Sequence, residues 1–385
     1  SLMHAHPESP PTLRDCQLPH DAVRGKWISQ GERTPSWNLS SLWADWKSES
    51  RQPGNSVPLV DIARQHRTQS CDTAKQWAWQ PTRCALMRLD PVRLCSVPAI
   101  TFIGDSLTRG WYVSLMHNLA SKGVNCTHAT ETYERERFTH MQCDGPCHGT
   151  RFTMLSNDFL CTGCARDEVL GGAFVRYRPQ FDLERLNNDS FAPRGRTVFI
   201  MGTGLHWGGE LRERGQAARL SVMAKNMQRA VAAANARQPH AVLLHTLWPG
   251  HKGCEVRLGQ GPDQSHDGRS TVEALRDLDE AAEEKLLWRW DEYVRYNALA
   301  SDLCSDPAMH CILLDIVPLS ATRRDAHRVF KGARPNVPDC SHWCSEGGPM
   351  LAWTQLLQLA IAPMGDVKRA RMRARARAML DGQKR

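Results

Sequence analysis

Short apolar runs alternate with longer amphipathic stretches along most of the chain. The short runs are rich in β-branched residues and predict strands buried on both faces, and the longer stretches predict helices. The expected strands are 98–103, 197–201, 241–246 and 312–316. One expected helix follows residue 106, and two others span 211–234 and 280–301. This alternation predicts an α/β fold of three layers, with a mainly parallel central sheet, whose sites gather at the carboxyl ends of the strands.

The sequence outside this pattern predicts the domain organisation. Residues 1–56 are rich in Pro, Ser and Gln, and we expect an extended or weakly ordered segment. Residues 57–365 are expected to form one domain, which opens with a Trp- and Cys-rich lead-in over 57–97. Residues 366–385 form a basic tail.

The even number of cysteines indicates an oxidising compartment. The chain has 14 of them, more than a cytosolic enzyme without metal clusters usually carries. Glycosylation sequons at Asn38, Asn125 and Asn188 agree with a lumenal setting. We therefore expect a fold stapled by disulfides, although the pairing does not follow from the sequence. A structural zinc site is an alternative for the CxxxC and CxxC spacing of Cys143, Cys147, Cys161 and Cys164.

Much of the formal net charge of +8 lies in the tail. We expect the tail to be a solvated segment or, alternatively, to contact an anionic surface. The chain lacks the aromatic and basic motifs of nucleic-acid-binding proteins, so no nucleic-acid partner is expected. It also lacks an apolar stretch long enough to span a membrane. Membrane association is expected only through a segment missing from this chain.

A first candidate for chemistry follows the expected strand 98–103. Gly104-Asp105-Ser106-Leu107 places a serine on a tight turn between a strand and a helix. Such a turn exposes the hydroxyl and puts the serine N–H near a helix N-terminus, where a developing oxyanion is stabilised. Taken alone, Ser106 is better explained as a helix N-cap.

A second motif favours the interpretation of Ser106 as a nucleophile over that of a helix N-cap. Asp339-Cys340-Ser341-His342-Trp343-Cys344 places a carboxylate three residues before a histidine. The carboxylate can fix the tautomer of the imidazole, which leaves the other ring nitrogen to deprotonate a serine. Together the motifs predict Ser106 as nucleophile, His342 as base and Asp339 as orienter.

At these motifs the sequence resembles the trichome-birefringence-like polysaccharide O-acetyltransferases, in the PC-esterase branch of the SGNH/GDSL superfamily. The resemblance runs from about residue 26 to residue 362. It rests on the tryptophan-rich lead-in at 77–90, the GDS block at 104–109, the approach at 313–327 and, most specifically, the DCxHWC block at 339–344.

The resemblance implies a lumenal enzyme, in the Golgi or secreted, that transfers acetyl groups to a polysaccharide or glycan hydroxyl through an acetyl-serine. It implies no bound cofactor and no metal, with acetyl-CoA or another acetyl ester as the donor. A carbohydrate acetylesterase of the same fold and a non-catalytic glycan-binding module are the alternatives.

The chain departs from this family where Gly202 replaces an asparagine of the family's Asn-Thr-Gly-His-Trp-Trp segment. If that asparagine donates to the oxyanion, Gly202 cannot, so the candidates for oxyanion donors are Ser106, Arg109 and Gly204.

The remaining histidines, aspartate and tryptophans near the motifs have weaker assignments. The candidates for substrate contact are Asp105, His206, Trp207 and Trp343. His327 is an alternative base that we interpret as a supporting residue, and His245 and His251 lack the spacing of metal ligands.

Overall fold

A computed structural model of the chain describes residues 15–30, 71, 74, 76–129, 138–162, 181–187, 197–211, 215–236, 241–247, 250–251, 254, 261–262, 292–330, 337–345 and 348–362. Within these ranges, the side chains of residues 127–129, 138–139, 209–210, 328–330 and 337–339 are not part of the description. The predicted tail, residues 280–291 of a predicted helix and the sequons at Asn38 and Asn188 lie outside the described residues.

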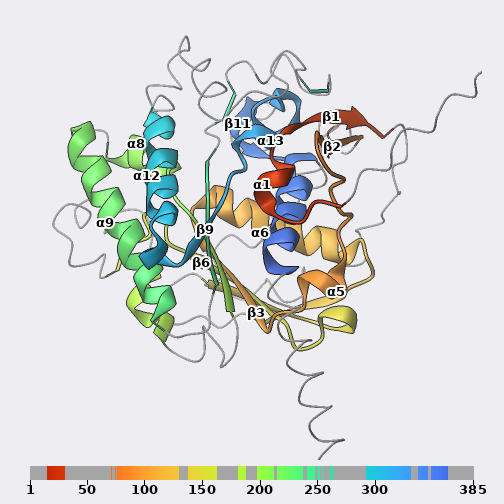
Figure 1. Cartoon of the computed structure of the whole chain (residues 1–385), viewed down its shortest axis with the longest axis horizontal. Helices are drawn as coiled ribbons and strands as arrows, with labels where there is room; N and C mark the ends of the chain where they lie inside the picture. Colours follow the sequence, from red (N-terminus) through yellow and green to blue (C-terminus); the bar gives the residue numbers. More distant parts are fainter. Residues whose placement is uncertain are drawn as a thin grey trace, which may run out of the picture.

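A seven-stranded sheet forms the centre of the described structure (Figure 1). Its pairings among β6, β3, β7, β8 and β9 are parallel, and β5 runs antiparallel to both of its neighbours. In spatial order the strands are β4 (Cys126–Ala129), β5 (Phe138–Cys143), β6 (Arg151–Ser156), β3 (Ala99–Gly104), β7 (Thr197–Gly202), β8 (Ala241–His245) and β9 (Cys311–Leu314). The predicted α/β fold with a mainly parallel sheet is confirmed.

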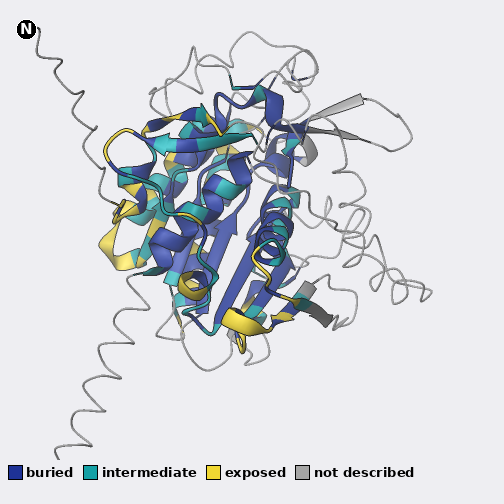
Figure 2. Cartoon of the chain, turned by 90° about the vertical axis from the view of Figure 1, so that its right-hand side faces the viewer, coloured by how far each residue is buried: buried dark blue, intermediate teal, exposed yellow. Residues whose placement is uncertain are grey.

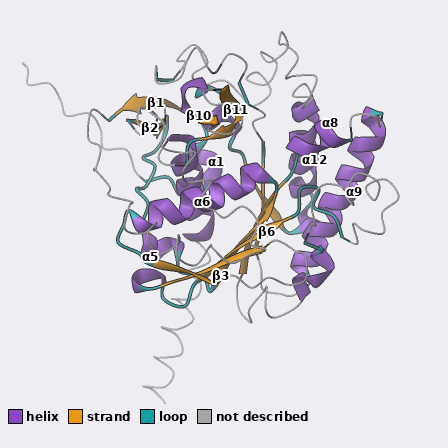
Figure 3. Ribbon diagram, turned by 180° about the vertical axis from the view of Figure 1, so that it is seen from behind, coloured by secondary structure: helices purple, strands orange, loops and turns teal. Residues whose placement is uncertain are grey.

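Helices cover both faces of this sheet. Figures 1 and 3 show α9 (Gln216–Asn235) and α12 (Tyr293–Ser305) on one side and α6 (Ser106–Ala120) on the other. β3 and β7 are buried along their whole length because side chains on both of their faces are covered, as Figure 2 shows for the sheet. Shorter helices are α1 (Pro19–Ala22), α5 (Pro91–Leu94), α8 (Leu205–Glu210) and α13 (Val317–Ser320).

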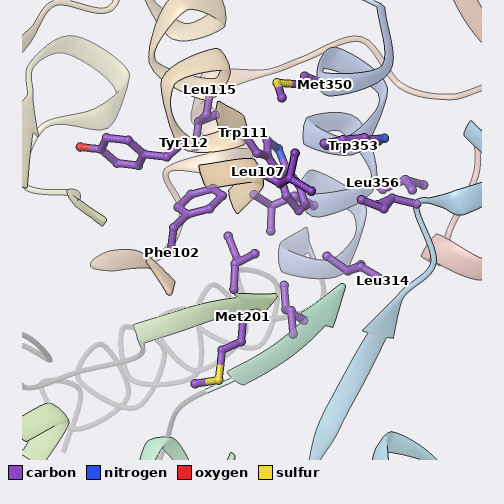
Figure 4. Close-up of a cluster of buried hydrophobic side chains, with 14 of the residues drawn as sticks. Phe102, Leu107, Trp111, Tyr112, Leu115, Met201, Leu314, Met350, Trp353 and Leu356 are labelled. Carbon is purple, nitrogen blue, oxygen red and sulfur yellow. The ribbon is translucent and has the colours of Figure 1, made fainter. Parts of the chain in front are cut away.

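An aromatic cluster joins the sheet to α6 and to the helical residues 348–362 (Figure 4). Trp111 of α6 makes edge contacts with Phe102 of β3 at 5.6 Å and with Trp353 at 5.7 Å. Its indole nitrogen donates to the Thr354 hydroxyl at 3.1 Å. Edge-to-face pairs add about 0.5–1.5 kcal/mol each beyond the area that they bury, so this cluster fixes α6 relative to β3.

Two antiparallel strand pairs lie together at one end of the molecule (Figures 1 and 3). In the first, β1 (Gly25–Ser29) pairs with β2 (Trp77–Pro81), and in the second, β10 (His327–Phe330) pairs with β11 (Val337–Trp343). The Arg323 guanidinium lies over the Trp27 ring of β1, with its carbon 4.4 Å from the ring centroid, and its NH2 donates to the Ala74 carbonyl at 3.2 Å. The first strand pair thus packs beside the segment that leads into the second.

Disulfides tie distant parts of the chain together, as the cysteine content predicts. The bonded pairs are Cys16–Cys84, Cys71–Cys344, Cys95–Cys147, Cys126–Cys143, Cys254–Cys340 and Cys304–Cys311, and Cys161 is also disulfide-bonded. Because Cys143 and Cys147 pair with other cysteines, the zinc site considered for them is wrong. Within the described ranges, no helix is long and apolar enough to cross a bilayer.

The four predicted strands match β3, β7, β8 and β9 to within a few residues at each end. Neither of the small antiparallel strand pairs was predicted, nor were β4, β5 and β6. Residues 15–30, which fall in the predicted N-terminal segment, include α1 and β1. The domain boundaries themselves stay predictions.

Candidate active site

The site begins where β3 turns into α6. Gly104 ends β3 opposite Gly202 of β7, and a Cβ at Gly104 would come within 2.2 Å of the Gly202 carbonyl oxygen. Only glycine allows the two strands to approach so closely. Asp105 then caps α6: one of its carboxylate oxygens accepts from the N–H groups of Leu107 at 2.9 Å and Thr108 at 3.4 Å. Ser106 is the first residue of α6, with its hydroxyl at the helix N-terminus.

Asp105 is almost fully buried, with 1% of its surface exposed. Burial is the main cause that raises the pKa of its carboxyl group, and the nearby Asp158 raises this pKa further. His206 and the two backbone N–H groups lower it in part. Its second carboxylate oxygen also accepts from the N–H of Leu205, at 3.4 Å, so Asp105 connects α6 to the segment after β7.

The structure brings Ser106 and His342 together from positions far apart in the sequence. The Nε2 of His342 lies 2.7 Å from the Ser106 Oγ, and both residues are half-buried. His342 lies in an irregularity of β11. His327 pairs with Trp343 and the next residue, Arg328, pairs with Asp339, so Cys340, Ser341 and His342 bulge out between these two rungs. A bulge of this kind re-aims side chains, here toward α6.

The third predicted member, Asp339, precedes this bulge in β11 and pairs with Arg328 of β10. Its side chain lies outside the described residues, so its role as orienter stays a prediction. The N–H of Ser106, the N–H of Gly204 and the Arg109 side chain likewise stay predicted oxyanion donors. Arg109 lies in the first turn of α6, half-buried, and Gly204 lies just beyond the carboxyl end of β7.

The structure explains how the chain accommodates Gly202. A Cβ at this position would lie 1.8 Å from the Nε2 of His245, so the His245 ring fills the space of a side chain there. The Nδ1 of His245 faces the Thr246 carbonyl at 2.9 Å and must therefore carry the proton, which leaves Nε2 to accept from the Thr108 hydroxyl at 3.1 Å. Burial lowers the pKa of His245 to about 4, so this ring is neutral near pH 7. It therefore takes the place of a side chain at 202 without supplying an oxyanion donor.

The predicted substrate contacts are mostly covered. Trp207 is fully buried against Phe159 and donates to the Thr203 hydroxyl at 2.8 Å, and Trp343 stacks on His327. His206 is 7% exposed, with its Nε2 3.8 Å from a carboxylate oxygen of Asp158. Stacking of a sugar on either indole would require the covering side chains to move, and the assignments stay predictions.

Three polar residues near the site were given no role there by the sequence motifs. Asp158 follows the carboxyl end of β6, and His245 lies at the carboxyl end of β8. The rule that sites gather at strand ends could therefore have indicated both residues as candidates. Thr108 lies within the GDS block itself. In the part of the chain that the structure describes, no cluster of His, Cys, Asp and Glu could hold a metal ion.

This arrangement can perform nucleophilic chemistry. The ring nitrogen of His342 is within hydrogen-bond distance of a serine hydroxyl, which is the geometry of a nucleophile and its base. The same serine lies at the N-terminus of the 15-residue helix α6, whose dipole stabilises negative charge.

The chain is similar to known proteins at the level of a family. Residues 93–360 match the PC-esterase model, described as the GDSL/SGNH-like acyl-esterase family found in Pmr5 and Cas1p. A xyloglucan O-acetyltransferase 4 of Populus trichocarpa is 31% identical over 100 residues, which cover 25% of this chain and 22% of that protein. A trichome birefringence-like protein 7 of Arabidopsis thaliana is 24% identical over 110 residues, 29% of this chain and 19% of that protein.

A trichome birefringence-like protein 42 of Arabidopsis thaliana is 42% identical over 50 residues, 13% of this chain and 14% of that protein. The chain thus spans about a fifth or less of the length of these curated relatives. The family model, in contrast, extends from the approach to β3 to the helical residues 348–362 and so includes both Ser106 and His342. Because this match covers well over half of the chain, the chain belongs to the PC-esterase family of GDSL/SGNH-like acyl-esterases.

Proposed function

We propose that this protein is a carbohydrate O-acetyltransferase that forms an acetyl-serine at Ser106. The observation that carries the proposal is the 2.7 Å approach of the His342 Nε2 to the Ser106 Oγ at the N-terminus of α6. Family membership supports acyl chemistry, and a relative named xyloglucan O-acetyltransferase supports a polysaccharide acceptor.

In the first half-reaction, the Ser106 Oγ attacks the acetyl carbonyl of the donor while His342 takes the hydroxyl proton. The N–H groups of Ser106 and Gly204, with Arg109, stabilise the negative charge on the carbonyl oxygen. His342 then returns the proton to the leaving group as the bond to the donor breaks. The donor is acetyl-CoA or another acetyl ester, bound as a substrate.

In the second half-reaction, His342 takes the proton of a glycan hydroxyl, and that oxygen attacks the acetyl-serine. Collapse of the intermediate breaks the bond to the Ser106 Oγ, and His342 returns the proton to that oxygen, which releases the acetylated glycan and regenerates Ser106. Asp339 would keep His342 in the tautomer that leaves Nε2 free to accept protons. The disulfides fit an oxidising compartment, and we place the enzyme in the Golgi lumen, with secretion as the alternative.

The acyl-esterase description of the family favours one other activity, in which water attacks the acetyl-serine. A single experiment separates the two: the protein is incubated with an artificial acetyl ester, with and without candidate oligosaccharides, and the products are measured by mass. Oligosaccharides that gain an acetyl group support the transferase, and acetate release alone supports the esterase. No turnover of any ester, with Ser106→Ala indistinguishable from the native chain, would instead favour a non-catalytic glycan-binding module.

A further inference from the structure

Two histidines outside the Ser106–His342 pair form hydrogen bonds with the backbone of the bulge in β11. His251 and His327 are buried, 1% and 0% exposed. The Nδ1 of His327 lies 3.0 Å from the carbonyl oxygen of His342, and the backbone N–H of His251 donates to the carbonyl of Cys340 at 3.1 Å. The two residues thus bind a carbonyl at each end of the bulge 340–342.

The two rings also bind each other. The Nδ1 of His251 lies 2.7 Å from the Nε2 of His327, and the Nε2 of His251 lies 2.8 Å from the Ala321 carbonyl oxygen. A carbonyl only accepts hydrogen bonds, so the ring nitrogens that face Ala321 and His342 must both carry protons. In two neutral imidazoles these would be the only ring protons, and two lone pairs would then face each other between the rings. A hydrogen bond between the rings therefore needs a third proton.

We propose that His251 and His327 share three ring protons, and so one positive charge, as a positioning pair that fixes the backbone of His342. Trp343 supports the charge: its ring stacks on His327 with centroids 4.2 Å apart and planes 26° apart, so an aromatic face covers the imidazolium. Asp325, on the segment that precedes β10, is bound to Arg323 by hydrogen bonds of 2.8 and 2.9 Å.

The consequence for catalysis rests on the proposed function. A charge-assisted N–H donor holds a carbonyl more strongly than a neutral one. The carbonyl held here belongs to His342 itself, so the bond fixes the backbone from which the imidazole reaches the Ser106 Oγ. Displacing a reacting group by about 1 Å can cost on the order of 100-fold in rate. The pair would therefore act on the rate of the chemical step rather than on substrate binding.

The proton count is tested first, without any assay of activity. The full chain is labelled with ¹⁵N-histidine, and the ring nitrogens of the two residues are assigned by comparison with His327→Asn. At a pH of about 8, where an ordinary histidine is neutral, the proposal expects three protonated nitrogens and one unprotonated nitrogen in the pair. Two protonated and two unprotonated nitrogens would overturn it.

Positioning is tested by two variants that remove the same ring. In His327→Asn the amide takes the place of Nδ1 and keeps a donor to the His342 carbonyl. In His327→Gln the amide reaches the place of Nε2 and keeps the contact with His251 but not the bond to His342. We expect kcat to be at least about tenfold lower in His327→Gln than in His327→Asn, with KM nearly equal and similar melting temperatures. Equal kcat values in the two folded variants would refute the positioning role.

Ser106→Ala separates this inference from the proposed function. If Ser106→Ala retains full turnover, the proposed mechanism fails, while the NMR proton count still decides whether the pair exists. If Ser106→Ala is inactive and His327→Gln equals the native chain in kcat, the positioning role fails and the mechanism survives.

Discussion

At the scale of single residues, the position of Ser106 is set by its neighbours. Asp105 caps α6 and Gly104 lets β3 approach β7, so the serine hydroxyl lies half-buried at the turn between the strand and the helix. The sequence predicted Ser106 and His342 from two local motifs. It could not predict that His245 fills the space above Gly202, because residues 202 and 245 lie on different strands and only the parallel register of β7 and β8 brings them together.

We expect Ser106→Ala to abolish acetyl turnover while the protein stays folded. The side chain is half-buried and makes no contribution to the cap, which Asp105 supplies, so removing one oxygen costs little stability. Loss of the nucleophile of a triad costs on the order of 10⁶ in kcat. Steady-state kinetics with an acetyl ester and a circular dichroism melt measure both effects, and near-native turnover in a folded variant would remove Ser106 from the mechanism.

Asp339→Asn should preserve the pairing of β11 and lower the rate sharply. An amide can present its N–H to the imidazole and favour the wrong tautomer, and in the serine-protease triad that exchange costs about 10⁴ in kcat. The double variant with Ser106→Ala should be little slower than Ser106→Ala alone, because triad members act as a unit. A fully active Asp339→Asn enzyme would mean that another group orients His342.

We expect His245 to lower the folding stability of the protein as the pH becomes acidic. Its pKa in the folded protein is about 4 because the ring is buried, below the value of about 6.5 for an unfolded histidine. The lowered pKa of His245 therefore adds to the free energy of unfolding. This stabilisation is complete above about pH 6.5 and is lost as the pH falls toward 4, with a total on the order of 3 kcal/mol. In His245→Gln, urea unfolding between pH 7 and pH 4 should show a smaller loss of unfolding free energy than in the native chain. The raised pKa of Asp105 acts in both proteins, so an equal loss would contradict the assignment to His245.

At the scale of elements, periodicity predicted the parallel strands β3, β7, β8 and β9 and missed the parallel strand β6 and the two small antiparallel strand pairs. Buried strands such as β7 are continuous apolar runs, which a pattern search finds easily. β11 instead reads Val-Pro-Asp-Cys-Ser-His-Trp, with a proline and mixed polarity, and its register is broken by the bulge. The bulge is stabilised by bonds from His251 and His327 and by the Cys254–Cys340 disulfide. These partners are remote in sequence, so no local pattern encodes the bulge.

Removing the Cys254–Cys340 disulfide should therefore affect the rate as well as stability. The double variant Cys254→Ala/Cys340→Ala frees one end of the bulge that carries His342, and we expect kcat to fall at least about tenfold through misplacement of the base. The control is Cys126→Ala/Cys143→Ala, which removes the disulfide between β4 and β5 at the far edge of the sheet. Both variants should lose about 2–5 kcal/mol of stability. Equal kcat in the two folded variants would show that the disulfide does not help to place His342.

At the scale of the whole molecule, disulfides connect segments that the sheet alone does not hold. Cys71–Cys344 links the part of the chain before β2 to the end of β11, and Cys16–Cys84 links the segment before α1 to the segment after β2. The sequence predicted a disulfide framework from the number of cysteines. It could not predict the pairing, because the separations between partners in the described pairs range from 7 to 273 residues and depend on the tertiary fold.

This framework predicts the redox state of the purified protein. We expect thiol titration of the denatured, unreduced chain to find few free thiols, and titration after reduction to approach the 14 cysteines of the sequence. The reason is geometric: Cys143 and Cys147, the pair with metal-like spacing, bond to Cys126 and Cys95, so a shared zinc site would require two disulfides to break. Elemental analysis of the same sample provides the control. Several reactive thiols together with stoichiometric zinc would mean that the protein matures in a reducing compartment, and the proposed lumenal location would then be wrong.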